Sequence, residues 1–351
     1  HRDLHLSIRR QRQMCIRDRF IVLLMNFDKM ATMTAVFLDY NTIGPDDLDP
    51  SPLIDCLPDI EFYGSTTPDE VKDRIQNAEF ILTNKVQLNS SNLEGAKKLK
   101  FIGLTATGAD NIDLGYAKKK NIRVCNIRAY CTQSVVEHVF GALLSLTHNL
   151  RSYSQLVDGG DWQKSDDFCL LRYPIKELSS MKLGVVGYGE LGRNVAKMGK
   201  AFGMSVIINT RSKNEFNCEE EHVTFKRLLE ESDVVSLHCP LTIETKNLIG
   251  IEEVKLMKPS SILINTARGG LIDSEALLFA LKNGIIAGAA IDVLPEEPPI
   301  NGNALLEYKK LNLIMTPHIA WGAIEARQNA ISQLAGTIKA FQNNQKINAL
   351  V

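Results

Sequence analysis

The stretch from Leu183 to Ser212 constrains the fold of this chain more than any other. An apolar run ending at Val186 is followed by Gly187, Gly189 and Gly192 in the spacing G-x-G-x-x-G, then by a helical pattern and a second apolar run. This order predicts a strand, a tight glycine turn, a helix and a parallel strand. Such a turn binds a dinucleotide, because the phosphates can approach the backbone at Gly189 and meet free N–H groups at the helix N-terminus.

From Met33 onward, apolar strand patterns alternate with helical patterns, which predicts an α/β fold with parallel sheets. The first half of the chain is expected to form one small sheet, and the second half a sheet built around the glycine turn. The expected strands are 34–39, 80–83, 101–104, 123–126, 183–186, 206–208, 233–237, 261–265, 286–291 and 311–315, and the expected helices start at Thr67 or span 91–99, 114–119, 133–153 and 324–341.

The helix expected over 133–153 has a wide apolar arc. A helix of this kind bridges two domains or packs against a partner subunit. His138 and His148 lie on it, and we expect both to be structural rather than catalytic.

The composition excludes several classes of protein. A formal net charge of −1 over 351 residues gives no support for nucleic-acid binding. No apolar run approaches the roughly 20 residues of a membrane-spanning helix. Seven cysteines, without a C-x-x-C pair or a metal-like spacing with histidine, predict free thiols in a reducing, cytoplasmic compartment and no bound metal.

Residues 1–32 do not share the pattern of the rest. His1 to Arg19 is rich in arginine and has no strand or helix period, and the apolar run from Phe20 to Met25 is shorter than the roughly 7–15 residues of a signal-peptide core. An arginine-rich transit peptide is the alternative to a non-native or disordered extension, which we favour. We expect a natural start at Met33 or Met30, and we expect deletion of 1–32 to leave fold and activity intact.

Polar clusters follow the expected strands where each strand ends. Because open parallel sheets bind ligands at the carboxyl ends of their strands, this shared position indicates one site. The clusters are His238-Cys239-Pro240, Thr266-Ala267-Arg268, Asp292 with Glu296-Glu297, Thr316-Pro317-His318 and, in the first half, Lys85 and Thr107-Gly108. The loop at Thr107-Gly108 is either an anion-binding nest of backbone N–H groups or an ordinary turn.

Three of these side chains have the chemistry of a hydride-transfer site. Arg268 is a fixed cation with forked donors for a carboxylate, His318 is suited to proton transfer near neutrality, and Glu297 could orient and charge that histidine. Singly, each has an ordinary alternative: a surface ion pair, a core histidine or a solvated loop. Beside a dinucleotide turn, they supply a cation for the substrate and an acid–base pair for the proton, while the nicotinamide carries the hydride.

Five motifs, in order, resemble those of the D-isomer-specific 2-hydroxyacid dehydrogenases: G-Y-G-E-L-G, H-C-P-L-T, I-N-T-A-R-G-G-L-I-D, A-I-D-V-L-P-E-E-P-P and T-P-H-I-A-W. Within that family the chain is most similar to glycerate dehydrogenases (hydroxypyruvate reductases), judging also by V-F-L-D-Y-N-T-I-G-P-D-D-L and S-D-D-F-C-L-L. The resemblance implies two Rossmann-like or flavodoxin-like parallel-sheet domains with the active site in the cleft between them. A discontinuous substrate-binding domain would comprise 33–131 and 318–351, and an NAD(P)-binding Rossmann domain 132–317.

The resemblance also implies roles for single residues. Arg268 would bind substrate, Glu297 would be the carboxylate partner and His318 the acid–base. The cofactor is expected to contact the glycine turn and the neighbouring strand ends: Gly187, Gly189, Glu190, Leu191, Gly192, Thr210, Arg211, His238, Cys239, Pro240, Thr266, Ala267, Arg268, Asp292 and His318. The expected substrate contacts are Lys85, Thr107, Gly108 and Arg268. Members of the family are homodimers, which would place the helix over 133–153 at the subunit interface.

The activity so implied is reduction of a small 2-oxo acid, hydroxypyruvate or glyoxylate, to D-glycerate or glycolate. Two other interpretations remain. A formate-dehydrogenase-like enzyme of the same family carries Gln at the position of Glu297, so this residue argues against it. A non-catalytic, dinucleotide-sensing corepressor is not excluded by an intact Arg268, Glu297 and His318, although the chain shows no docking extension.

The choice between NADP(H) and NAD(H) depends on a departure from the usual pattern. An NAD-preferring site places Asp or Glu about 20 residues after the first glycine, where it hydrogen-bonds the ribose. Here Thr210 stands at that position and Arg211 follows it. No carboxylate would repel a 2′-phosphate and Arg211 could pair with one, so we expect NADP(H) to be used at least as well as NAD(H). The alternative is that Arg211 only stacks on the adenine, which would leave both cofactors accepted.

Overall fold

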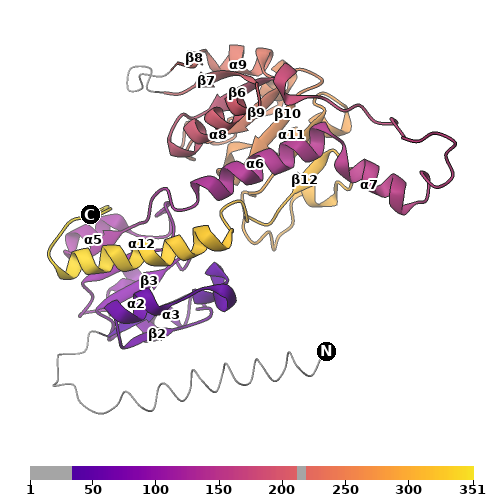
Figure 1. Cartoon of the computed structure of the whole chain (residues 1–351). Coiled ribbons are helices and arrows are strands. Elements are labelled where there is room, and N and C mark those ends of the chain that lie inside the picture. The colour runs from indigo at the N-terminus through magenta and orange to yellow at the C-terminus, as the bar shows by residue number, and fades with distance from the viewer. Residues whose placement is uncertain (1–33, 212–218) are drawn as a thin grey trace, which may run out of the picture.

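The computed structural model describes residues 34–211 and 219–351, which form two all-parallel β-sheets covered by helices (Figure 1). The extension expected over 1–32 and the residue Ser212 lie outside the described residues. Figure 1 shows the two sheets in separate lobes, with α6 (Thr132–Thr147) crossing from the first lobe to the second and α12 (Ile324–Gln342) lying along the first.

The first sheet has the strand order β2-β1-β3-β4-β5. Its strands are β1 (Ala35–Phe37), β2 (Ile60–Phe62), β3 (Phe80–Thr83), β4 (Phe101–Leu104) and β5 (Arg123–Cys125). The strands β1, β3 and β4 are buried along their whole length, as a parallel sheet requires when helices cover both faces. One face packs against α2 (Ser51–Cys56) and α12, and the other against α3 (Val71–Ile75), α4 (Ser90–Leu93) and α5 (Leu114–Lys119).

The second sheet has the order β12-β11-β10-β9-β6-β7-β8. Its strands are β6 (Lys182–Val186), β7 (Ser205–Asn209), β8 (Glu221–His222), β9 (Val234–Leu237), β10 (Ile262–Asn265), β11 (Gly288–Ile291) and β12 (Leu313–Met315). One face packs against α6 and α8 (Glu190–Ala201), and the other against α9 (Phe225–Glu231), α10 (Ile251–Leu256) and α11 (Ser274–Lys282). The strand order reverses between β6 and β9, and that crevice is where such sheets bind dinucleotides.

Two segments join the lobes side by side. The first follows β5 and leads into α6, and the second follows β12 and leads into α12, which returns to the first sheet. Tyr130 in the first segment packs edge-to-face against Trp321 in the second, with ring centroids 6.4 Å apart. Trp321 also contacts the apolar cores of both lobes, so the two crossings form one packed junction.

The single helix expected over 133–153 is wrong, because α6 ends at Thr147 and α7 spans Leu150–Asp158. Asn149 between them has φ 52°, in the left-handed region that asparagine tolerates better than most residues. Its side chain donates to the Pro174 carbonyl at 2.7 Å, which stabilises the break. The helical pattern runs through the break and conceals it.

Two helix boundaries in the first half also differ from expectation. The helix expected over 91–99 is only α4, which Asn89 caps by accepting hydrogen bonds from two backbone N–H groups of its first turn. The helix start expected at Thr67 is a turn: the Glu70 carboxylate accepts a hydrogen bond from the Thr67 N–H at 2.8 Å, and α3 begins at Val71. In both places the capping chemistry is present without the expected helical turns.

Candidate active site

A cleft of about 660 Å³ lies between the two sheets, at the carboxyl ends of their strands. Its lining comes from loops of both lobes and from the segment that joins them. Of the residues expected in the site, it brings together Lys85, Thr107, Gly108, Leu191, Thr266, Arg268, Asp292, Glu297 and His318. The remaining expected cofactor residues lie outside this lining, on the glycine turn and on the ends of β7, β9 and β10: Gly187, Gly189, Glu190, Gly192, Thr210, Arg211, His238, Cys239, Pro240 and Ala267.

His318 and Glu297 form a pair in this cleft. The Nδ1 of His318 lies 2.7 Å from Oε2 of Glu297, and Oε1 of the same carboxylate accepts the Leu294 N–H at 2.8 Å. Burial opposes ionisation of Glu297, but the hydrogen bond and charge of His318 outweigh it and lower the pKa of the carboxyl. Because Nδ1 is committed to the carboxylate, Nε2 is the ring atom available to exchange a proton with a substrate.

Arg268 faces the first lobe across the cleft. Its Nη1 donates to the Ala267 carbonyl at 2.8 Å, and its Nη2 lies 3.8 Å from Oδ2 of Asp110. A Cβ at Gly108 would come within 2.5 Å of Nη2, so glycine there lets the guanidinium approach the 105–108 loop. The cation is thereby fixed between its own strand end and the opposite lobe.

Lys85 adds a second basic side chain to the cleft. Burial lowers the pKa of its ammonium, and the nearby positive charge of Arg268 lowers it further. The loop that carries Lys85 is held by Asp39, a buried residue after β1 whose carboxylate accepts the Lys85 N–H at 2.6 Å and the Asn84 N–H at 2.9 Å. From the sequence, Asp39 is expected only as the last residue of a strand. The same signal that indicated the other clusters, a polar residue after an apolar strand, applies to it.

Asp292 holds the loop that carries His318. Its side chain is buried, and it accepts hydrogen bonds from the Thr316 hydroxyl at 2.6 Å and from the N–H groups of Ile319 and Ala320 at 2.9 Å each. A carboxylate can accept about four hydrogen bonds, so one position is left for another donor. The cofactor contact expected for Asp292 stays a prediction.

The glycine turn has the geometry that a pyrophosphate needs. Gly187 has φ 92°, and a Cβ there would lie 2.6 Å from the Cys239 amide nitrogen. A Cβ at Gly192 would overlap the Gly187 carbonyl oxygen. Gly189 faces open space and is the N-cap of α8, with no side-chain hydrogen bond to the first turn. The N–H groups of the first helical turn can therefore meet an anion. In addition, Thr266 Oγ1 is buried without a hydrogen-bond partner among the described residues, as expected of a group that awaits a ligand atom.

The cofactor residues expected after β7 and after β9 differ in exposure. The backbone N–H and carbonyl of Thr210 lie 3.3 and 3.0 Å from Nε2 of His222, and Arg211 is exposed. His238, after β9, has its Nε2 2.8 Å from Ser236 Oγ, and burial lowers the pKa of its imidazole to about 4. The His238 ring is therefore neutral at physiological pH.

Within the described residues, 34–211 and 219–351, no three His, Cys, Asp or Glu side chains come together as a metal site would require. Over the same residues, no helix has the length and apolar character needed to cross a membrane.

Residues 140–320 match the family described as D-isomer specific 2-hydroxyacid dehydrogenase, NAD binding domain. A glycerate dehydrogenase of Methylorubrum extorquens is 44% identical over 281 residues, which cover 80% of this chain and 88% of the relative. A hydroxypyruvate reductase of Blautia hydrogenotrophica is 34% identical, with 91% of this chain and 99% of the relative covered.

Two solved structures show the same arrangement of lobes. The D-lactate dehydrogenase of Aquifex aeolicus, complexed with NAD and lactic acid, is 32% identical with a TM-score of 0.77 and covers 91% of this chain and 99% of its own. An acyclic imino acid reductase in complex with NADPH and D-Arg is 27% identical with a TM-score of 0.80. The match covers 91% of this chain and 100% of the reductase chain. The chain therefore belongs to the D-isomer-specific 2-hydroxyacid dehydrogenase family and has its two-domain, Rossmann-like α/β fold.

Proposed function

We propose that this D-2-hydroxyacid dehydrogenase reduces hydroxypyruvate or glyoxylate to D-glycerate or glycolate. The observation that carries the proposal is the 2.7 Å pair of His318 and Glu297 in one cleft with Arg268. Such a site has a cation for a carboxylate and a proton donor for a carbonyl oxygen. The names of the relatives, glycerate dehydrogenase and hydroxypyruvate reductase, support the same class of substrate.

The substrate carboxylate binds between the lobes. Arg268 pairs with it and draws electron density from the adjacent 2-oxo group, while the backbone N–H groups near Thr107 and Gly108 hold its other side. Lys85, whose pKa is lowered by burial, lines the same cleft and adds positive potential. We infer that 33–131 with 318–351 supply the substrate side of the cleft and 132–317 the cofactor side.

The chain supplies the proton, and a nicotinamide bound in the cleft would supply the hydride. In reduction, protonated His318 donates a proton from Nε2 to the 2-oxo oxygen. Glu297 holds Nδ1 and stabilises the imidazolium before the transfer. In oxidation the same Nε2 accepts the proton of the 2-hydroxyl group.

For the cofactor, we propose use of NADP(H) at least as well as NAD(H). Thr210 supplies no carboxylate against a 2′-phosphate, and exposed Arg211 carries the charge to pair with one. The pKa of Glu244 is lowered mainly by a hydrogen bond from Thr242. The positive charge of nearby Arg211 contributes to the same shift. Thr210→Asp should move preference toward NAD(H), and a kcat/KM more than about tenfold higher for NADH than for NADPH in the wild type would contradict the proposal.

Steady-state turnover tests the function as a whole. Hydroxypyruvate, glyoxylate, pyruvate and, in the oxidative direction, formate are each assayed with both cofactors. The proposal expects hydroxypyruvate or glyoxylate to give the highest kcat/KM. Oxidation of formate would favour the formate-dehydrogenase alternative. Tight cofactor binding without turnover would favour the corepressor alternative.

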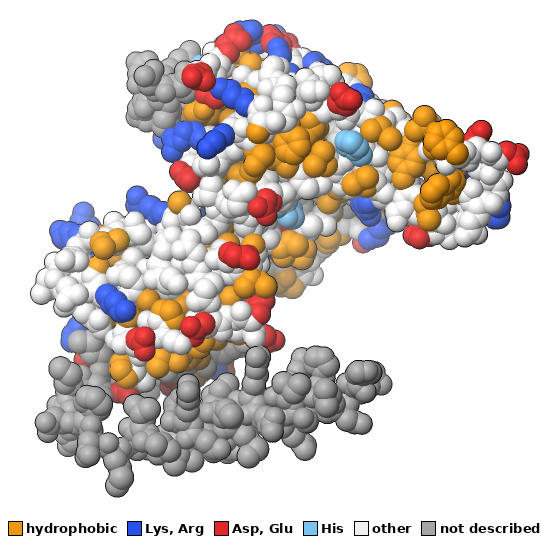
Figure 2. Space-filling view, in the orientation of Figure 1, with side chains coloured by type: hydrophobic (Ala, Val, Ile, Leu, Met, Phe, Trp, Pro, Cys, Tyr) orange, Lys and Arg blue, Asp and Glu red, His pale blue; other side chains and the backbone are white. Residues whose placement is uncertain are grey.

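We also propose a homodimer formed through α6, α7 and the segment that follows them. Figure 1 shows α7 and this segment projecting from the second lobe, and Figure 2 shows hydrophobic side chains gathered on the projection. Its exposed apolar residues are Leu150, Val157, Trp162, Phe168, Leu171, Tyr173 and Ile175. Phe168 is 91% exposed, and such a patch on a soluble domain marks an interface. Phe168→Glu with Leu171→Glu should shift the mass measured by light scattering from dimer to monomer.

A further inference from the structure

The backbone at His318 adopts a conformation that needs support. His318 has φ 55°, in the left-handed region, which is unfavourable for a residue with a Cβ. Its N–H donates to the Asp292 carbonyl at 2.8 Å, and its carbonyl accepts the Trp321 indole N–H at 2.9 Å. The next two N–H groups, of Ile319 and Ala320, donate to the Asp292 carboxylate. The position of that carboxylate therefore sets the direction in which the His318 side chain leaves the loop.

The Asp292 carboxylate is itself held by Thr316 and, through Thr316, by α6. The Thr316 hydroxyl donates to its Oδ1 at 2.6 Å, and the hydroxyl oxygen lies 3.1 Å from Nε2 of His138 on α6. Because Thr316 has a single hydroxyl proton and gives it to Asp292, the bond with His138 requires that Nε2 carry a proton and donate it. Donation runs in one direction, from His138 to Thr316 to Asp292.

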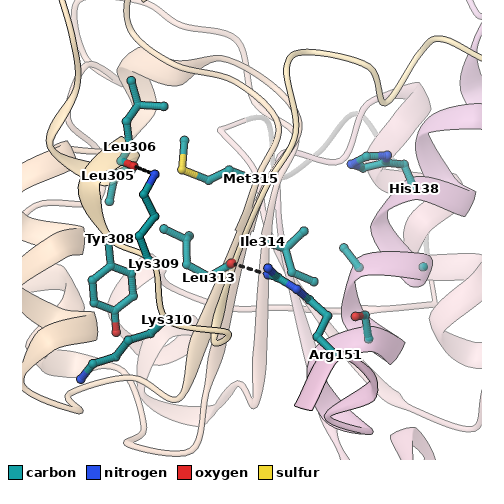
Figure 3. A pocket seen from close by; sticks show the side chains of 13 residues that line it. His138, Arg151, Leu305, Leu306, Tyr308, Lys309, Lys310, Leu313, Ile314 and Met315 are labelled. Atoms are coloured by element: carbon teal, nitrogen blue, oxygen red, sulfur yellow. Dashed lines mark hydrogen bonds between the residues drawn. The ribbon is translucent and has the colours of Figure 1, made fainter. Parts of the chain in front are cut away.

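His138 lies between two cavities. Its ring, 21% exposed, faces a cavity of about 590 Å³ between α6, α7 and the segment 305–315 (Figure 3), while its Nε2 lies 3.8 Å from Asp292 Oδ1. Figure 3 shows the His138 ring extending from α6 toward the loop that follows Met315. The Asp292 carboxylate lines the active-site cleft on the other side. The three side chains thus connect α6 with the cleft through the loop that carries His318.

We propose that His138 is a positioning residue for the acid–base His318. Its Nε2–H orients the Thr316 hydroxyl toward Asp292, and the carboxylate so oriented holds the Ile319 and Ala320 N–H groups and the left-handed turn at His318. His138 does not touch the substrate, so its loss should impair the chemical step and leave the binding of the cofactor largely unchanged. This inference rests on the proposed role of His318.

The test compares four single variants of the full-length protein and the double variant that combines His138→Leu with Thr316→Val. His138→Leu and Thr316→Val each remove the donor to the next group at nearly constant volume, and His138→Gln keeps an amide N–H near the position of Nε2. Ser145→Ala, on the same helix and lining the same cavity, is the matched control. We expect His138→Leu and Thr316→Val each to lower kcat by about 10–100-fold, the range for a catalytic group displaced by about 1 Å.

The pattern among the variants decides the proposal. His138→Gln should recover most of the lost kcat, and Ser145→Ala should match the wild type. The double variant should be no slower than the slower of the two single variants, because both changes break the same chain of hydrogen bonds. A His138→Gln enzyme as slow as His138→Leu would overturn the role of the donated hydrogen bond, as would additive losses in the double variant. Wild-type kcat in His138→Leu would overturn the proposal altogether.

Hydrogen exchange gives a readout that does not depend on the reaction. The proposal expects the amides of Ile319 and Ala320 to exchange faster in His138→Leu than in the wild type, and equally fast in Ser145→Ala and the wild type. Unchanged exchange in His138→Leu would overturn it. If the wild type turns over no 2-oxo acid, the proposed function fails, and the exchange result still decides whether His138 supports the loop.

Discussion

Two histidines follow strands of the same sheet, and their surroundings give them opposite properties. His318, after β12, shares a 2.7 Å hydrogen bond with the Glu297 carboxylate in an open cleft. His238, after β9, has only the Ser236 hydroxyl beside Nε2 and a buried Nδ1 without a partner among the described residues. Burial lowers the pKa of His238 to about 4, so it stays neutral. The difference shows that a charged partner and solvent, rather than position on the strand, suit a histidine to acid–base chemistry.

The largest effect is expected from removing His318, the histidine to which we assign the proton transfer. His318→Ala should lower kcat for hydroxypyruvate reduction by about 10²–10⁴-fold, because general acid catalysis is worth about that much. The dissociation constant of the cofactor, measured by fluorescence titration, should change little. If His318→Ala keeps most of its turnover, the proton comes from elsewhere and the assignment of His318 is wrong.

Arg268 tests whether the cleft around His318 does more than supply a proton. Arg268→Ala should lower kcat and raise KM together, because its contact to the carboxylate is made in both the ground state and the transition state. Arg268→Lys should recover part of the loss, since it keeps the charge but not the forked geometry. A change confined to KM would mean that Arg268 binds substrate without polarising the carbonyl.

Glu297→Gln takes from His318 the charged partner that His238 lacks. The hydrogen bond and charge of His318 lower the pKa of Glu297 against the effect of burial, so the pair favours the ionised carboxylate. By reciprocity its charge favours the protonated histidine. Glu297→Gln should therefore move the alkaline limit of reduction to lower pH, with a loss in kcat of about tenfold.

The neighbouring carboxylate provides the matched control for that experiment. Glu296 is exposed and accepts a hydrogen bond from Asn301 rather than from His318. Glu296→Gln should leave the pH profile of kcat where it is in the wild type. A profile that moves with Glu296→Gln and not with Glu297→Gln would transfer the role to Glu296.

The smallest effect concerns His238 and appears in stability. A histidine whose pKa is about 4 when folded and about 6.5 when unfolded binds its proton more tightly in the unfolded chain. Acidification from about pH 6.5 to 4 therefore reduces the free energy of unfolding, by up to about 3 kcal/mol from this group. His238→Gln should lose less stability than the wild type between pH 7 and pH 4.5 in urea titrations. Parallel losses in the two proteins would show that His238 is not buried in its neutral form.

The sequence predicted the fold where structure is encoded locally. The strands β3 and β4 have the expected bounds because each is a short apolar run between turn residues. Arg268, Glu297 and His318 meet in the cleft because each follows a strand of one parallel sheet or lies in the loop after it.

Other features depend on contacts between distant residues and could not be predicted. The break at Asn149 is stabilised by a carbonyl 25 residues away, and Asp39 holds a loop 46 residues away. His138 reaches Thr316 across 178 residues. Nothing in the local pattern around His138 distinguishes it from a structural histidine on a helix, which is what the sequence predicted.

We propose that His318, charged by Glu297, protonates the 2-oxo oxygen of the substrate. This is tested by measuring NAD(P)H consumed and D-glycerate formed from hydroxypyruvate by the wild type and by His318→Ala under identical conditions. We expect one D-glycerate for each NAD(P)H oxidised by the wild type, and a rate lower by at least about 10²-fold in the variant. Equal rates in the two proteins, or cofactor oxidation without D-glycerate, would contradict it.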